Sequence, residues 1–341
     1  MDCLEPINAI YLDNTDSGYK IQPCCLYNGT VGTVDSIDEI QIKNQELWPT
    51  LNYEKSCIAC LSKERHNEHS KRLESLKRVT HEKDLVRFDI RPGNTCNLKC
   101  VMCTPRNSSA WQQDIELWTK YNSDYKDRRK ELDWEWIYSK CINKAEEIYV
   151  AGGEPFYMKS VQKFLKKLSY HSWNCENTNI VIQTNGISNT PKFLEILSKF
   201  KKLHISISID GWEDVNELIR FPTKHKDVIR GIEEIQDVEP YKLDFNITVQ
   251  AMNLLNIDTL IQNIGSYNYN LFKLINPFYL SINCLKPQVI ESCNVESKEL
   301  QDFIEDYEYD SVHNSKMQKY LLDLDILRGT NSRKIVPWCY V

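Results

Sequence analysis

With 341 residues, of which 41% are hydrophobic and 11% aromatic, the chain can bury the core of one large α/β domain or of two smaller units. Its formal net charge of −6 excludes the strongly basic balance that general nucleic-acid binding requires. No stretch near the start resembles a signal peptide, and no run of about 18 apolar residues predicts a membrane span. We therefore expect a cytoplasmic protein without membrane attachment.

The chain begins with a cysteine-rich segment, residues 1–83, which also contains turn-prone stretches and a charged helix expected from about residue 60. The segment has too little apolar sequence for a large core, so it predicts a small separate module. The whole chain has 13 cysteines. In a large chain without an export signal, metal or cluster ligation explains an odd number of cysteines better than disulfides do.

Strand-like runs alternate with helical patterns from residue 84 onward. The runs are rich in Ile, Val, Phe and Tyr, and they span residues 84–90, 147–153, 179–186, 203–210, 244–250 and 278–285. Helices are expected around 132–145, 161–170, 191–200, 228–236 and 255–264. This alternation predicts an α/β fold with parallel strands and crossover helices over residues 84–285. Residues 286–341 predict an extension with helices near 297–308 and 315–327.

The stretch CNLKCVMC follows the first of these strands and places Cys96, Cys100 and Cys103 on one loop. Ligands of parallel α/β sheets bind beyond the carboxyl ends of the strands, which is where this loop is expected. The spacing favours a [4Fe–4S] cluster with one open iron. A zinc site with a distant fourth ligand and three buried core cysteines are the alternatives.

CNLKCVMC resembles the signature loop of the radical S-adenosylmethionine (SAM) enzymes, although Met102 stands where that family usually has an aromatic residue. AGGEPF, TNG and SISIDG follow the next three strands in the family's order. The resemblance implies a partial (β/α)6 TIM-like barrel over residues 84–285. It also implies that three thiolates hold a [4Fe–4S] cluster whose open iron binds SAM. Reductive cleavage then gives a 5′-deoxyadenosyl radical that abstracts a substrate hydrogen.

The same resemblance implies a SAM pocket built from the ends of successive strands. GGE is expected to approach the methionyl end through backbone atoms, so that a side chain added at Gly153 would interfere with SAM. Arg220 is expected to bind the SAM carboxylate. Other polar residues are expected to bind the ribose and the base. The implied SAM-binding residues are Met102, Gly152, Gly153, Glu154, Thr184, Asn185, Ser208, Asp210, Arg220, Gln250 and Asn253.

The N-terminal cysteines resemble the auxiliary-cluster modules called SPASM or twitch domains, which usually follow the barrel rather than precede it. The shared features are a cysteine, a strand, Gly18 in a turn, a second cysteine and a C-x2-C pair. We expect Cys3, Cys24, Cys57 and Cys60 to hold a second [4Fe–4S] cluster, with Cys25 as a rival for Cys24. By spacing alone, zinc explains this set about as well as iron.

The resemblance favours an oxidoreductase-type radical SAM enzyme that oxidises or cross-links a side chain of a peptide or protein. Radical oxidation or rearrangement of a small molecule, such as a sugar or nucleotide derivative, is the alternative enzyme. The non-enzymatic alternative is an interaction protein whose cysteines bind structural zinc. An external reductant such as flavodoxin or ferredoxin is the expected partner. The remaining cysteines, of which Cys339 is the one that could approach a site, are expected to be core thiols: Cys141, Cys175, Cys284, Cys293 and Cys339.

Overall fold

The computed structural model describes residues 3–29, 31–50, 52–65, 67, 69–77, 85–122, 129–293 and 298–341. The expected domain boundary between residues 83 and 84 lies outside these residues. The chain divides into two compact units of nearly equal size. The first comprises Met1–Thr95, Lys126–Gln183 and Thr190–His204, and the second comprises Cys96–Tyr125, Thr184–Asn189 and Ile205–Val341.

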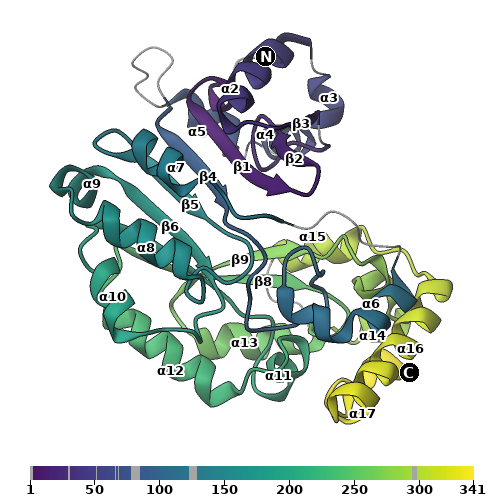
Figure 1. Cartoon of the computed structure of the whole chain (residues 1–341). Coiled ribbons are helices and arrows are strands. Elements are labelled where there is room, and N and C mark those ends of the chain that lie inside the picture. Colours follow the sequence, from purple (N-terminus) through teal and green to yellow (C-terminus); the bar gives the residue numbers. More distant parts are fainter. Residues whose placement is uncertain are drawn as a thin grey trace. The chain divides into compact units, whose positions relative to one another are not determined.

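Nine strands follow one another in the sheet in the order β3-β2-β1-β4-β5-β6-β7-β8-β9 (Figure 1). The pairs β1–β4, β4–β5, β5–β6 and β8–β9 are parallel, whereas β1–β2 and β2–β3 are antiparallel. This open, mainly parallel sheet confirms the expected α/β class and is consistent with a partial barrel. The strands are β1 Ala9–Thr15, β2 Gly18–Ile21, β3 Gly32–Val34, β4 Arg87–Arg91, β5 Glu147–Val150, β6 Asn179–Thr184, β7 Lys202–Ser208, β8 Lys242–Val249 and β9 Asn268–Lys273.

The N-terminal segment adds strands to the sheet of the first unit, which differs from the separate module that the sequence predicted. β1 runs parallel to β4, with Ile10 opposite Phe88 and Leu12 opposite Ile90. All four of these side chains are completely or almost completely buried. Because side chains alternate across a strand, the intervening residues of β1 and β4 face the opposite side of the sheet. The apolar face of β1 therefore joins the core of the first unit.

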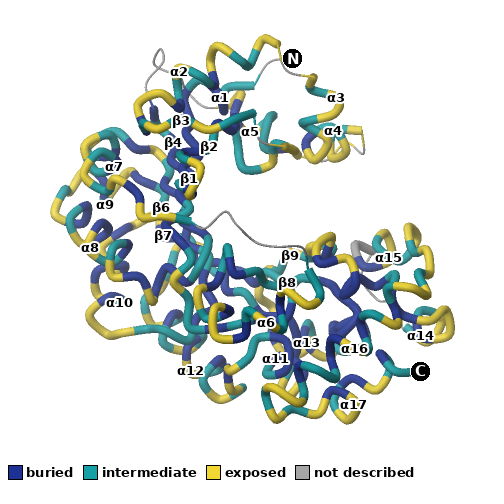
Figure 2. The backbone as a smooth tube through the Cα atoms, turned by 45° about the vertical axis from the view of Figure 1, so that its right-hand side comes forward, coloured by how far each residue is buried: buried dark blue, intermediate teal, exposed yellow. Residues whose placement is uncertain are grey.

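Several helices of the first unit begin at residues whose side chains accept hydrogen bonds from the first turn, as helix N-caps do. Asp133 accepts from the Trp136 amide at 2.9 Å, and Thr190 accepts from the Phe193 amide at 3.3 Å. Their outer faces carry most of the exposed residues, while the strands are largely buried (Figure 2). The helices of the first unit are α1 Glu5–Asn8, α2 Ile37–Leu47, α3 Tyr53–Ser56, α4 Ile58–Arg65, α5 Lys71–Leu76, α7 Trp134–Cys141, α8 Lys159–Leu168, α9 Ser172–Asn177 and α10 Pro191–Leu197, with the 3₁₀ turn η1 Trp48–Thr50.

The second unit packs its core around α16 Ser311–Arg328, the longest described helix. Met317, Tyr320 and Leu321 of this helix are fully buried in that core. The other helices of the unit are α6 Ile115–Tyr121, α11 Asp214–Ile219, α12 His225–Gln236, α13 Ile257–Ile264, α14 Pro287–Glu291, α15 Lys298–Glu305 and α17 Ser332–Ile335. Short 3₁₀ turns are η2 Ser109–Asp114, η3 Leu254–Asn256, η4 Phe278–Leu280, η5 Ile282–Cys284 and η6 Pro337–Tyr340. None of the described helices has the length and hydrophobicity needed to cross a membrane.

The prediction of a sixth strand over residues 278–285 was wrong. This stretch forms η4 and η5, and its apolar side chains other than Phe278 are buried in the core of the second unit. The sixth parallel strand from residue 85 onward is instead β9, in which exposed and half-buried residues alternate. The run that forms β9 was missed because Asn268 and Asn270 interrupt its apolar pattern. An apolar run of this length cannot be assigned to a strand or a buried turn by periodicity alone.

Candidate radical SAM site

The loop that carries Cys96, Cys100 and Cys103 is fastened by its backbone in the second unit. The amide of Lys99 donates to the carbonyl of Phe221, and the amide of Val101 donates to that of Ile219, both at 2.8 Å. Within the loop, the Cys103 amide donates to the Cys100 carbonyl at 2.9 Å. The loop backbone is thus anchored at and just after the end of α11.

Helix α16, in the C-terminal extension, donates hydrogen bonds to carbonyl groups of the same loop, a role that the sequence did not reveal. The hydroxyl of Tyr320 donates to the Val101 carbonyl at 3.0 Å, and Nη2 of Arg328 donates to the Lys99 carbonyl at 2.8 Å. The indole of Trp111 donates to the Cys100 carbonyl at 3.0 Å. Each of these donors is almost completely buried, so the bonds form where water cannot compete. The extension after residue 285 therefore supports the cysteine loop directly.

A buried ion pair follows the fourth strand predicted from the sequence. Nε of Arg220 lies 2.7 Å from Oδ2 of Asp210, whose side chain is fully buried, while that of Arg220 is 12% exposed. Burial disfavours the charge of Arg220, but Asp210 outweighs it and raises the pKa of the guanidinium. The Cys100 and Cys103 thiols also act on this pKa, which places Arg220 beside the cysteine loop. The structure thus brings Asp210 and Arg220 together with two of the three cysteines.

Asn253 and Gln250 are both fully buried at the end of β8. Asn253 donates to the carbonyls of Asp210 and Thr248, each at 2.9 Å, and accepts from the Gln250 amide at 2.8 Å. Neither polar atom of the Gln250 side chain has a hydrogen-bond partner among the described residues. Because burying an unpaired amide is costly, these atoms fit a role in binding a polar ligand.

The other expected positions of the second unit make local contacts. Asn185 donates to Oδ1 of Asn97 in the cysteine loop at 2.9 Å, and its own Oδ1 accepts from the Ile187 amide at 3.1 Å. The hydroxyl of Thr184 accepts from the Gly186 amide at 3.0 Å. Ser208, at the end of β7, is half-buried, and Met102 packs against the core of the second unit.

The GGE motif lies in the first unit, after β5. The Glu154 amide donates to the Thr95 carbonyl at 2.9 Å, and its buried carboxylate accepts from the Phe156 amide at 2.9 Å. A Cβ atom at Gly153 would lie 2.2 Å from Cε of Met158 and 2.6 Å from the Thr95 carbonyl oxygen. The protein's own atoms therefore already exclude a side chain at Gly153, which the sequence had ascribed to SAM alone.

We expect Gly153→Ala to destabilise the first unit even without SAM. Its φ of +59° disfavours an L-residue by about 1–2 kcal/mol, and overpacking adds about 1–3 kcal/mol. Gly329→Ala is the matched control, since Gly329 has a φ of +65° and nothing within 4 Å of an added Cβ. Urea denaturation should show the larger loss for Gly153→Ala. An equal loss of unfolding free energy in both variants would mean that Met158 and Thr95 move aside to make room for the methyl group.

Four N-terminal cysteines line one cavity of the first unit, and they are the four that the sequence assigned to an auxiliary cluster. Cys3, Cys24, Cys57 and Cys60 share this cavity with lining residues Glu5, Pro6, Pro23, Tyr27, Trp48, Lys71 and Arg72. Cys57 and Cys60 flank the start of α4, and the Cys60 amide donates to the Cys57 carbonyl at 3.1 Å. Burial raises the pKa of the Cys57 thiol to about 11 and that of Cys24 to about 12.

Cys25 does not line this cavity. Its thiol instead accepts a hydrogen bond of 2.9 Å from Nζ of Lys71, which also lies 3.7 Å from the buried carboxylate of Asp89. Cys25 is therefore tied to charged residues of β4 and α5. Of the two adjacent cysteines, the structure places Cys24 with the other three.

The donor chemistry fits two thiolate-ligated clusters, with three cysteines on one loop and four around one cavity. As the side chains stand in the described ranges, no three His, Cys, Asp or Glu groups converge closely enough to hold a metal ion. Of the remaining cysteines, Cys141, Cys284 and Cys339 are buried, as expected of core thiols, and Cys339 contacts the Ala251 carbonyl at 3.5 Å, whereas Cys175 and Cys293 are only half-buried.

Residues 90–249 match the model of the radical SAM superfamily. The chain contains a radical SAM domain. Radical SAM domains use a [4Fe–4S] cluster and SAM, which agrees with the cofactors expected from CNLKCVMC. The matched residues include the three-cysteine loop, GGE and the Asp210–Arg220 pair, but they end before α16.

Several known proteins are similar to parts of this chain. The GTP 3′,8-cyclase of Helicobacter pylori is 26% identical over 181 residues, which cover 52% of this chain and 50% of the cyclase. The solved structure of anSMEcpe with bound AdoMet is 18% identical. The match covers 70% of this chain and 58% of the anSMEcpe chain, with a TM-score of 0.43. The structure of Streptococcus suis SuiB bound to the precursor peptide SuiA is 16% identical. The match covers 90% of this chain and 56% of the SuiB chain, with a TM-score of 0.37. The chain thus spans half to three-fifths of the length of these proteins.

Proposed function

We propose that the protein is a radical SAM enzyme that cleaves SAM reductively and uses the 5′-deoxyadenosyl radical to abstract a substrate hydrogen atom. The observation that carries this proposal is the three-cysteine loop, which lies inside the matched segment and beside Asp210 and Arg220. Cys96, Cys100 and Cys103 would hold the [4Fe–4S] cluster, which supplies the electron when it is bound. Arg220, oriented by Asp210, would receive the SAM carboxylate, and Gln250 would bind a polar group of the nucleoside.

The N-terminal cavity supports a second cluster held by Cys3, Cys24, Cys57 and Cys60. Four thiolates would fill every iron position, so this cluster would carry electrons rather than bind substrate. Removal of a hydrogen atom leaves the substrate with one unpaired electron. Transfer of that electron to the second cluster, with loss of a proton, would complete a two-electron oxidation. A flavodoxin or ferredoxin would supply the electron that starts the next cycle.

The substrate proposed first is a side chain of a peptide or protein, which the enzyme would oxidise or cross-link. This rests on the four-cysteine module, since SPASM-like modules accompany radical SAM enzymes that modify peptides. A nucleotide is the second candidate. It is favoured by the GTP 3′,8-cyclase of Helicobacter pylori, whose 26% identity extends over 181 residues.

Substrate-stimulated SAM cleavage would distinguish the two candidates. Anaerobically reconstituted, reduced protein should release 5′-deoxyadenosine slowly on its own and faster with its substrate. We expect a short peptide encoded beside the gene to accelerate release, and GTP to have no effect. Deuterium transferred from a labelled peptide to 5′-deoxyadenosine would identify the abstracted position. Acceleration by GTP alone would reject the peptide proposal and support the nucleotide one.

A further inference from the structure

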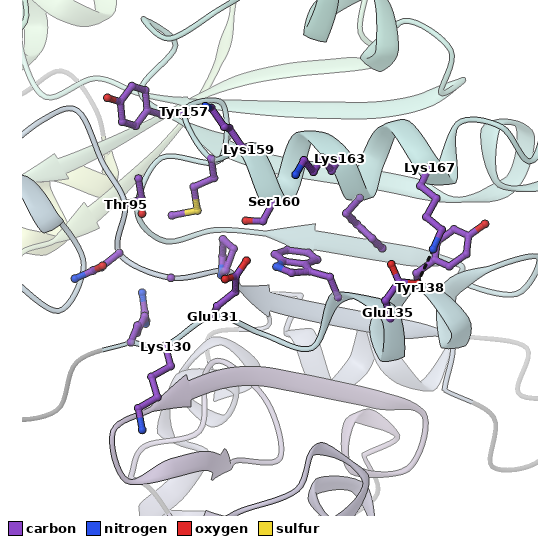
Figure 3. A pocket seen from close by; sticks show the side chains of 17 residues that line it. Thr95, Lys130, Glu131, Glu135, Tyr138, Tyr157, Lys159, Ser160, Lys163 and Lys167 are labelled. Carbon is purple, nitrogen blue, oxygen red and sulfur yellow. Dashed lines mark hydrogen bonds and ion pairs between the residues drawn. The ribbon is translucent and has the colours of Figure 1, made fainter.

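The first unit also contains a pocket of about 710 Å³, whose walls are α7, α8 and the loops at residues 92–95 and 129–131 (Figure 3). No cysteine and none of the expected SAM-binding positions is among its lining residues. Trp134 and Tyr138 of α7 and Tyr157 before α8 contribute aromatic surface. Its lining residues Thr95, Arg129 and Met158 lie against Gly152 and Gly153, so the pocket adjoins the GGE motif without including it.

The amino-terminal turns of α8 bring positive charge to this pocket. Lys159 and Lys163 line it, are exposed, and form no ion pair with any described residue. Figure 3 shows Lys163 extending from α8 over the pocket, while Lys130 points away. Lys130 is paired with Asp16 at 3.7 Å, and Lys167 is paired with Glu135 at 2.6 Å.

Two residues that line the same pocket, Arg129 and Trp134, each have a buried N–H donor without an acceptor. Arg129 is 8% exposed at its side chain, and its Nε pairs with Asp13 at 2.9 Å. Its Nη1 has no hydrogen-bond partner among the described residues, and the same holds for Nε1 of Trp134. A buried donor without an acceptor costs about 1–3 kcal/mol, so native proteins rarely retain one without a reason. A ligand rich in acceptors would satisfy both donors.

The start of α8 adds further donors. The N-cap residue, Met158, has no side chain that can accept a hydrogen bond from the first turn. The free amides and the helix dipole at such an end favour negative charge. Of the carboxylates that line the pocket, Glu135 is paired with Lys167, whereas Glu131 has no ion pair within the described residues. Glu131 therefore opposes the binding of an anion, although the cations and free donors outnumber it.

We propose that this pocket binds an oxyanion, a carboxylate or a phosphate, between Lys163, the start of α8, Arg129 and Trp134. The ligand is an acidic peptide segment in the carboxylate case and a nucleotide or other phosphate ester in the phosphate case. Either source presents the same acceptor oxygens to the same donors. Anion binding here requires neither cluster nor SAM, so this proposal stands independently of the proposed reaction.

Binding can be measured by titration calorimetry with two probes, inorganic tripolyphosphate and a tetraglutamate peptide, with tetraglutamine as the neutral control. We expect binding of at least one anionic probe and none of tetraglutamine. The affinity should fall as the salt concentration rises, because exposed charges are screened within about 10 Å at 0.1 M salt. Tripolyphosphate binding alone would identify a phosphate ligand, and tetraglutamate binding a carboxylate ligand.

Three variants test the location of the bound anion. Lys163→Gln should weaken binding about threefold, and Glu131→Gln should strengthen it by a similar factor, as expected for partly exposed charges. Lys166→Gln should change nothing, because Lys166 is exposed on the same helix but does not line the pocket. Trp134→Phe should weaken binding by removing one donor while keeping an aromatic ring. Absence of binding to both anions, or equal effects of Lys163→Gln and Lys166→Gln, would overturn the proposal.

Discussion

Replacing Cys96, Cys100 and Cys103 together by alanine is expected to abolish the formation of 5′-deoxyadenosine from SAM. The three thiolates are the only protein ligands proposed for the core cluster, so their removal leaves nothing to hold its iron. The fold should survive, because Tyr320, Arg328 and Trp111 hold the loop through carbonyl groups that alanine retains. Chromatography of the nucleoside product, together with an iron assay, measures both expectations.

Cys175→Ala is the matched control for the loss of a thiol. Cys175 is half-buried in α9, where its Sγ contacts the Ser169 carbonyl at 3.4 Å. This variant should cleave SAM at the wild-type rate. Continued SAM cleavage in the triple variant would reject the assignment of the core cluster to the CNLKCVMC loop.

Replacing Cys57 and Cys60 together should separate the two clusters. Both residues line the N-terminal cavity of the first unit, whereas the three-cysteine loop belongs to the second. Iron should fall from about eight to about four atoms per chain, because two remaining thiolates cannot retain a [4Fe–4S] cluster. SAM cleavage should persist, while conversion of the substrate should fail without an electron acceptor.

Cys25→Ala provides the control for this second experiment. Because Cys25 is bonded to Lys71 and does not line the cavity, its loss should leave the iron content unchanged, whereas Cys24→Ala should lower it. Normal substrate conversion in the Cys57/Cys60 double variant would show that the cavity has a structural role alone. Iron loss in Cys25→Ala with retention in Cys24→Ala would exchange the roles of the two cysteines.

The sequence predicted the parts of the fold that depend on local pattern. β4 to β8 lie in the runs of branched and aromatic residues, and CNLKCVMC, GGE and SIDG each follow a strand as expected. The pairing of β1 with β4 escaped prediction because it joins segments more than 70 residues apart, and no local pattern encodes that contact. The choice between Cys24 and Cys25 stayed open for a similar reason. It depends on Lys71, a residue 46 positions away from Cys25.

The support of the cysteine loop by the C-terminal helix was also beyond the reach of sequence patterns. Tyr320 and Val101 are 219 positions apart, and Arg328 and Lys99 are 229 apart. In the sequence, Tyr320 reads as one of several apolar positions of a helix, and Arg328 as a charge at its end. Their burial against the loop follows from tertiary packing, which overrides the usual exposure of arginine.

The metal content of the anaerobically purified and reconstituted wild-type protein tests the central claim most directly. Plasma emission analysis and a sulfide assay should find about eight irons and eight sulfides per chain, corresponding to two [4Fe–4S] clusters, without zinc. About four irons with one zinc would leave the radical SAM domain in place and contradict the auxiliary cluster. Zinc without iron at either site would contradict the whole account.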